Sequence, residues 1–214
     1  MNVNDAMPIR AIICDFGGVL TTPLGNTFAA WSKTTGISLE DLGKAIAASA
    51  ERHGDHPLFV LERGEVTEVE FFGRIQRELS AEQSLDGMGE ALMAGLERNH
   101  EMIEYVAELR GRGLRAALLT NNVREWEPRW RGMLPEIDEI FEVVVDSAFV
   151  GMRKPEPEIY ELTVERLGGG LRAEDCVFVD DIAVNCDAAR ELGMTAVQFE
   201  TTDQARADIE QALS

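Results

Sequence analysis

Residues 11–20 read AIICDFGGVL, and this stretch decides the fold class. An apolar run over residues 11–14 is followed at once by Asp15, and two glycines, Gly17 and Gly18, come directly after Phe16. A charged carboxylate left unpaired beside a buried strand costs several kcal/mol. We therefore predict a buried strand that ends at Asp15, with the carboxylate facing a cation or an open cleft instead of the core.

Four later runs are also short, apolar and bounded by turn signals, and helical stretches separate them. They are RAALLTN (115–121), FEVVVDS (141–147), CVFVDD (176–181) and TAVQFE (195–200). Short strands that are apolar on both faces are typical of a parallel sheet covered by helices. The sequence therefore predicts the α/β class, with ligands expected beyond the carboxyl ends of the strands.

The interval from residue 21 to residue 99 contains no comparable strand and is predicted to be helical. Ser38 and Thr67 each begin a capping-box pattern, and apolar residues follow both at helical spacing. A helical insertion directly after the first strand should lie above the carboxyl end of that strand. We therefore expect it to act as a lid.

The composition excludes several classes of function. The 214 residues contain 20 Lys and Arg against 39 Asp and Glu, a formal charge of −19. This charge opposes nonspecific binding to nucleic acid or to an anionic membrane. The N-terminal MNVNDAMPIR has no basic start followed by an apolar stretch, so we expect a cytoplasmic protein. Cys14, Cys176 and Cys186 show no paired spacing and are expected to be buried thiols, and the oligomeric state stays open.

Three carboxylates follow predicted strands and form a candidate magnesium site. Asp15 ends the first strand, and Asp180 and Asp181 end the fourth. Carboxylate oxygens, together with a substrate phosphate, are typical ligands of Mg²⁺. The carbonyl of Gly17 is a further candidate ligand, and Gly18 allows the chain to turn closely past a bound group.

Three other residues at the same edge are candidates for holding an anion. Thr120 offers a hydroxyl and Asn121 a backbone N–H after the second strand, and Lys154 offers a charge in the loop after the third. Each feature alone would usually be a turn, a cap or a solvated loop charge. Their joint occurrence, in order, predicts a positive centre on an acidic protein.

These motifs resemble those of the haloacid dehalogenase-like hydrolase superfamily. The four matching stretches are DFGGVL, LLTNN, the lysine of GMRKPEPEIY, and VFVDDIAVNCDAARELGM. The insertion, with LERGEVTEVEFF, resembles the helical cap of the subgroup that contains the N-terminal phosphatase domain of soluble epoxide hydrolases. The resemblance implies a Rossmann-like doubly wound core over residues 1–20 and 100–214 and a helical cap over residues 21–99.

The resemblance also implies a chemistry. Asp15 would attack the phosphorus of a small phosphorylated metabolite, and water would then hydrolyse the aspartyl-phosphate. Mg²⁺ held by Asp15, the Gly17 carbonyl and Asp181, with Asp180 nearby, would reduce charge repulsion. Thr120, Asn121 and Lys154 would hold the phosphoryl oxygens.

Gly17 departs from the pattern of the family's phosphatases, which have a second Asp at this position as the general acid and base. Hydrolysis could therefore be slow, prefer leaving groups that need no proton, or use another group. Nearby candidates are Thr21, Thr22, Glu62, Arg63 and Glu65.

Two other functions stay open at the level of sequence. The first is a haloacid dehalogenase, which also lacks the second Asp; in such a metal-free site, however, Asp180 and Asp181 would repel each other without a cation to compensate. The second is a protein that binds a phosphorylated ligand without efficient catalysis. Trp126 and Trp130, with arginines beside them, form either a binding patch or part of the core.

Overall fold

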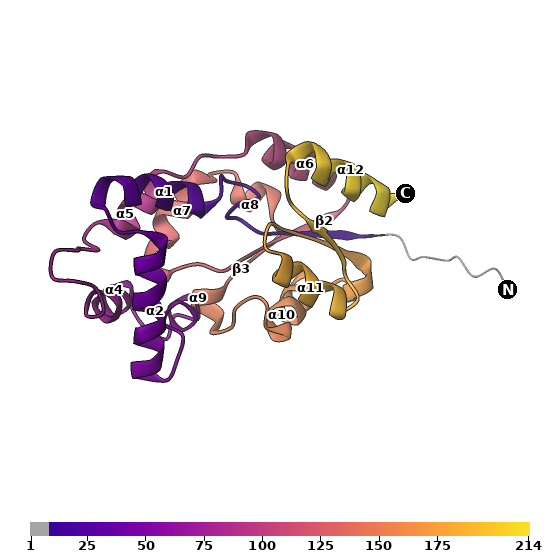
Figure 1. Cartoon of the computed structure of the whole chain (residues 1–214). Coiled ribbons are helices and arrows are strands. Elements are labelled where there is room, and N and C mark those ends of the chain that lie inside the picture. The colour runs from indigo at the N-terminus through magenta and orange to yellow at the C-terminus, as the bar shows by residue number, and fades with distance from the viewer. Residues whose placement is uncertain (1–8) are drawn as a thin grey trace.

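The computed structural model describes residues 9–214, and its core is a five-stranded parallel sheet (Figure 1). The strands are β1 (Ala11–Cys14), β2 (Arg115–Thr120), β3 (Val143–Asp146), β4 (Cys176–Asp180) and β5 (Thr195–Gln198). Their order is β3-β2-β1-β4-β5, and every neighbouring pair is parallel. All five predicted strands and the parallel arrangement are confirmed. The strand order reverses at β1, so the switch point that favours ligand binding lies at the carboxyl end of this strand.

Helices cover both faces of the sheet. Successive residues of a strand point to opposite sides, so the residues of β1 divide between two buried clusters. Ile12 and Cys14 share a buried cluster with α6 (His100–Gly111) and α12 (Thr202–Leu213). Ala11 and Ile13 share another with α10 (Pro157–Leu167) and α11 (Ala183–Glu191). Figure 1 shows the two pairs of helices on opposite sides of the sheet. The predicted Rossmann-like doubly wound fold is confirmed.

Residues 21–99, named here the cap segment, form helices at the end of the molecule opposite the C-terminus (Figure 1). The helices are α1 (Leu24–Thr35), α2 (Leu39–His53), α3 (Pro57–Glu62), α4 (Glu68–Gln76) and α5 (Met88–Ala94). Both predicted capping boxes, at Ser38 and Thr67, are present. An antiparallel bridge between Thr21 and Arg98 and a hydrogen bond from the Thr22 N–H to the Glu97 carbonyl join the two ends of the segment. Its division from the core as a separate domain stays a prediction.

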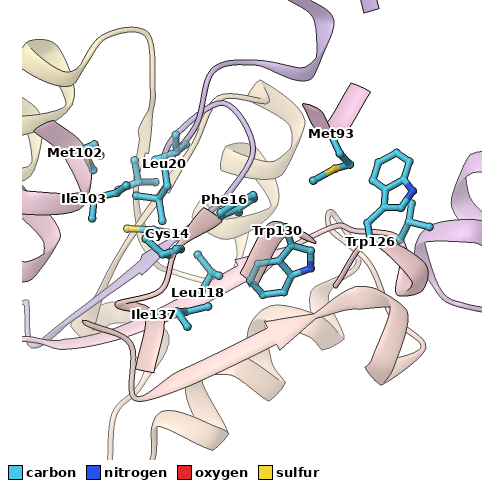
Figure 2. Close-up of a cluster of buried hydrophobic side chains, with 14 of the residues drawn as sticks. Cys14, Phe16, Leu20, Met93, Met102, Ile103, Leu118, Trp126, Trp130 and Ile137 are labelled. Carbon is cyan, nitrogen blue, oxygen red and sulfur yellow. The ribbon is translucent and has the colours of Figure 1, made fainter. Parts of the chain in front are cut away.

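The two tryptophans after β2 belong to the core. They lie in the 3₁₀ turn Arg124–Trp126 and in α7 (Glu127–Met133), and both side chains are buried. The ring centroids of Trp130 and Phe16 are 5.4 Å apart, and Figure 2 shows both rings in one apolar cluster with Cys14. The packing interpretation is confirmed, and because Trp126 also lines a cavity between the core and the cap segment, the binding alternative stays a prediction.

The remaining elements are short: α8 (Ile137–Ile140), α9 (Ser147–Val150) and the 3₁₀ turn Ala173–Asp175. All three cysteines are buried and free, as predicted. Within residues 9–214, no helix is both long and apolar enough to cross a membrane. Residues 1–8 lie outside the described residues, and with them most of the N-terminal stretch on which the localisation was predicted and the start of the predicted core domain.

Candidate active site

The polar residues predicted to meet at the sheet edge do lie together. Asp15 follows β1 directly, Thr120 ends β2, and Asp180 ends β4. One oxygen from each of Asp15, Asp180 and Asp181 lies within 4.8 Å of the other two. Three carboxylates so close repel one another strongly unless cations compensate for them.

Lys154 supplies one such cation. Its side chain is 1% exposed, and its Nζ lies 2.8 Å from Asp15 Oδ1 and 2.6 Å from Asp180 Oδ2. Burial alone lowers the pKa of Lys154, but the charges of the two carboxylates outweigh burial and raise the pKa above its ordinary value. The lysine is therefore a charged, fixed donor at the end of β1.

Asp180 fixes this lysine and is itself held by a set of donors. The backbone N–H of Ile182 donates to Asp180 Oδ1 over 2.8 Å, and Asn185 Nδ2 lies 3.0 and 3.1 Å from the two carboxylate oxygens. Asn185 comes from the buried face of α11, and the sequence analysis missed it. A polar residue on that face, one helical turn after two aspartates, is the signal that could have indicated it.

Asn121 holds the backbone of the lysine loop, residues 151–156. Its side-chain Nδ2 donates to the Lys154 carbonyl over 2.9 Å, and its Oδ1 accepts from the Lys154 N–H over 2.8 Å. The side chain therefore positions Lys154, and the backbone N–H of Asn121 is the group predicted to meet an anion. Thr120 is buried beside it, at the end of β2.

The donor set fits a divalent cation. Burial raises the pKa of Asp15 to about 7, even though Lys154 opposes the shift, and Asp180 adds to it. Burial, and then the charge of Asp180, also raise the pKa of Asp181, whose Oδ1 is buried without a hydrogen-bond partner among the described residues. A Cβ on Gly18 would lie 2.3 Å from Asp181 Oδ2, and the φ of Gly18 is +83°. Only glycine lets the chain pass so close to this carboxylate, and a cation would satisfy the oxygen that has no partner.

A cavity of about 330 Å³ opens beside this cluster, between the core and the cap segment. Gly17, Thr120 and Asn121 line it from the core side. The cap segment contributes mainly apolar side chains, among them Phe28, Ile46, Leu61, Phe71, Met88 and Leu92. The space around Gly17 is open, since nothing lies within 4 Å of the Cβ that it lacks.

The cap segment contacts the core beside the lysine loop. Arg63 pairs with Glu156, and Arg153 Nε lies 2.5 Å from Glu62 Oε2. Gly64 lies so close to the core that a Cβ there would be 2.3 Å from the Ala148 carbonyl oxygen. The end of α3 and the turn after it therefore pack against the loop that carries Lys154.

The sequence over residues 9–193 matches the family model of haloacid dehalogenase-like hydrolases. The chain belongs to this family. The resemblance stated from the sequence is thereby confirmed. Asp15, Lys154, Asp180 and Asp181 at the sheet edge belong to the stretches that carried this resemblance.

Curated relatives extend the comparison. Bifunctional epoxide hydrolase 2 of Rattus norvegicus is 30% identical over 121 residues, which cover 55% of this chain and 22% of that protein. This chain spans about a fifth of the length of several curated relatives that it matches, the rat protein among them. The sesquiterpene phosphatase astK of Aspergillus oryzae is 27% identical over 200 residues, 89% of each chain.

Solved structures of the family have the same fold. A HAD-like family hydrolase from Porphyromonas gingivalis superposes with a TM-score of 0.70 at 25% identity, covering 96% of this chain and 98% of that one. A HAD family enzyme from Bacteroides thetaiotaomicron, in complex with magnesium and inorganic phosphate, gives a TM-score of 0.65 at 21% identity, covering 91% and 96%. The haloacid dehalogenase-like hydrolase fold therefore extends over nearly the whole chain.

Proposed function

We propose that this hydrolase is a magnesium-dependent phosphatase that uses Asp15 as its nucleophile. The observation that carries the proposal is the cluster of Asp15, Asp180 and Asp181 around the buried Lys154. Asp15, Asp181 and the Gly17 carbonyl would hold Mg²⁺, with Asp180 close by. The bound ion would reduce the repulsion between the attacking carboxylate and the phosphoryl group. The Bacteroides neighbour with magnesium and phosphate supports this choice of ligands.

Each residue of the proposed active site then has a defined role. An oxygen of Asp15 attacks phosphorus, and the aspartyl-phosphate that forms is hydrolysed by water. The Thr120 hydroxyl, the Asn121 N–H and the Lys154 ammonium hold the phosphoryl oxygens, where negative charge must be stabilised. Asp180 and the Asn121 side chain keep Lys154 in place through the contacts described above.

The cavity supports a finer proposal, that the alcohol part of the substrate is apolar. Hydrophobic side chains dominate the lining beyond Thr120 and Asn121. Such a surface gains about 0.8 kcal/mol for each methylene that it buries but has few groups to pair with sugar hydroxyls. The relative named a sesquiterpene phosphatase supports the same substrate class.

A series of phosphate esters tests the proposal. Phosphate release from linear alkyl phosphates of increasing length and from sugar phosphates is measured with Mg²⁺ and with EDTA. We expect kcat/KM to rise by up to about fourfold per added methylene until the cavity is filled. EDTA and Asp15→Asn should abolish release. Asp138→Asn, at a carboxylate that is 88% exposed on α8, is the control and should retain activity.

Two further measurements separate the rival functions. Halide release from chloroacids without metal would indicate a dehalogenase, and the absence of a side chain at Gly17 is the observation that favours it. Tight magnesium-dependent binding of inorganic phosphate in calorimetry, without turnover of any ester, would indicate a binding protein. Ester hydrolysis that survives EDTA or Asp15→Asn would contradict the proposed mechanism.

A further inference from the structure

The phosphatase chemistry proposed above needs a proton donor and acceptor that Gly17 cannot supply. Among the described residues that line the cavity, the one ionisable side chain is Glu62, the last residue of α3. Glu62 lines the same cavity as Gly17, Thr120 and Asn121, from the side of the cap segment. Burying this carboxylate in a largely apolar cavity costs free energy, which an ion pair with Arg153 offsets.

The position of the Glu62 side chain is fixed by the contacts around it. Arg153 donates to Glu62 Oε2 from 2.5 Å, and the side chains of this pair are 12% and 14% exposed. The Arg153 guanidinium lies 4.0 Å from the centre of the Phe59 ring, so packing fixes the partner as well. Arg63 and Gly64, the next two residues, contact Glu156 and Ala148 of the core. A carboxylate held in this way is preorganised to act on a substrate in the cavity.

Burial has the largest effect on the pKa of Glu62. Burial raises the pKa of Glu62 above its ordinary value, although Arg153, Lys154 and Arg63 each lower it. A general acid and base works best when its pKa lies near the working pH, and burial of a carboxyl group is a common way to reach that range.

The other candidate groups near Gly17 are occupied elsewhere. The Thr21 hydroxyl donates to the Thr22 carbonyl, and the Thr22 hydroxyl accepts from the backbone N–H of Glu97. Arg63 is paired with Glu156, and Glu65 is exposed. Glu62 is the candidate that lines the cavity.

We propose that Glu62 is a catalytic residue of the proposed phosphatase and performs the proton transfers for which Gly17 has no side chain. In the first step an Asp15 oxygen bonds to phosphorus, and the bond from phosphorus to the ester oxygen breaks. The bonding pair stays on the ester oxygen, which takes the Glu62 proton and leaves as the alcohol. In the second step a water oxygen bonds to phosphorus and gives one proton to Glu62, and the bond to Asp15 breaks. Its electron pair returns to Asp15, and phosphate is released.

Glu62→Gln tests this role, because glutamine keeps an oxygen that can accept from Arg153 but cannot donate an acidic proton. With p-nitrophenyl phosphate, whose leaving group departs without a proton, we expect the first turnover to proceed nearly as in the wild-type protein. The second step should then stall, so that phosphorylated protein accumulates and is detected by intact mass. With decyl phosphate we expect turnover to fall by about 10²-fold or more, without that adduct.

Gly17→Asp provides the rescue experiment. A Cβ on Gly17 would have no neighbouring atom within 4 Å, and Gly17 lines the cavity into which a side chain could extend. In the Glu62→Gln background it should restore turnover of decyl phosphate and abolish the accumulated adduct. Arg98→Gln is the matched control, since it removes another contact between cap segment and core, that of Arg98 with Glu136, and leaves Glu62 and its ion pair with Arg153 unchanged. It should change both substrates by the same factor and accumulate no adduct.

The outcomes separate this inference from the function on which it rests. Equal losses on both esters in Glu62→Gln without an adduct, or no rescue by Gly17→Asp, would reduce Glu62 to a structural contact and overturn the inference. Wild-type hydrolysis that is lost in Asp15→Asn would still support the phosphatase in that case. If the wild-type protein hydrolyses neither ester, the proposed function and the role of Glu62 fail together.

Discussion

Lys154 Nζ lies 2.6 Å from Asp180 Oδ2, and neither side chain is more than 1% exposed. The same ammonium reaches Asp15 Oδ1 at 2.8 Å, so one buried cation serves two buried carboxylates. Asp180 takes its other hydrogen bonds from Ile182 and Asn185. The contact with Asp180 therefore fixes the Lys154 ammonium in a position where it also contacts Asp15.

Replacing Lys154 by methionine should destabilise the protein strongly. The substitution keeps most of the unbranched side chain but leaves the three clustered carboxylates without the cation of Lys154. Removing one partner of a buried ion pair typically lowers the free energy of unfolding by about 3–5 kcal/mol. Urea unfolding in EDTA measures the change. The control is Lys44→Met, at a side chain that is 71% exposed, which should change stability by less than about 0.5 kcal/mol. Similar values for the two variants would show that the carboxylates are compensated in another way.

The two glycines after Phe16 should respond differently to alanine. At Gly18 the new methyl group would lie 2.3 Å from Asp181 Oδ2, and φ is +83°, so Gly18→Ala is strained and displaces this carboxylate. At Gly17 nothing lies within 4 Å, so the same change is tolerated. We expect Mg²⁺ to raise the melting temperature of the wild-type protein and of Gly17→Ala but not that of Gly18→Ala, because a ligand stabilises only the state that binds it.

Calorimetric titration with Mg²⁺ checks the same point without unfolding the protein. We expect both Asp181→Asn and Gly18→Ala to bind Mg²⁺ weakly, whereas Asp138→Asn should bind it like the wild type. Equal affinity in Gly18→Ala and Gly17→Ala would contradict the assignment of Asp181 as a ligand.

The sequence predicted those features that depend on local pattern. Apolar runs bounded by turns indicated all five strands, and Ser38 and Thr67 indicated two helix starts, because each signal lies within a few residues. The convergence of Asp15, Thr120, Lys154 and the two aspartates followed from topology alone, since the carboxyl ends of parallel strands share one edge.

The contacts that the sequence could not predict join residues far apart in the chain. Glu62 and Arg153 are 91 residues apart, and Asn121 and Lys154 are 33 apart. Such pairs depend on how the cap segment and the loops pack on the core, which no periodicity encodes. The sequence therefore identified Glu62 as one of several candidates, and the cavity was needed to choose among them.

Asp146 gives the protein a pH dependence outside the proposed ligands. It ends β3, opposite Thr120 in the sheet register, and its Oδ1 accepts from the Ala148 N–H over 3.0 Å. Burial raises the pKa of Asp146 from 3.8 to about 6, against the lowering effect of that hydrogen bond. The folded state therefore holds the proton more tightly than the unfolded state. The stability from this group is complete below about pH 4 and is lost as the pH rises through about 6.

Asp146→Asn should remove this loss, because asparagine stays neutral and keeps an oxygen for the Ala148 N–H. Relative to the wild type, the variant should gain up to about 3 kcal/mol in free energy of unfolding between pH 4 and pH 7, with little further change above. Urea unfolding of both proteins at several pH values measures this difference, in which titrations shared by the two proteins cancel. Exposed Asp138 provides the control, since Asp138→Asn should give a curve parallel to that of the wild type. A parallel curve for Asp146→Asn would mean that the pKa of Asp146 is not raised in the folded protein.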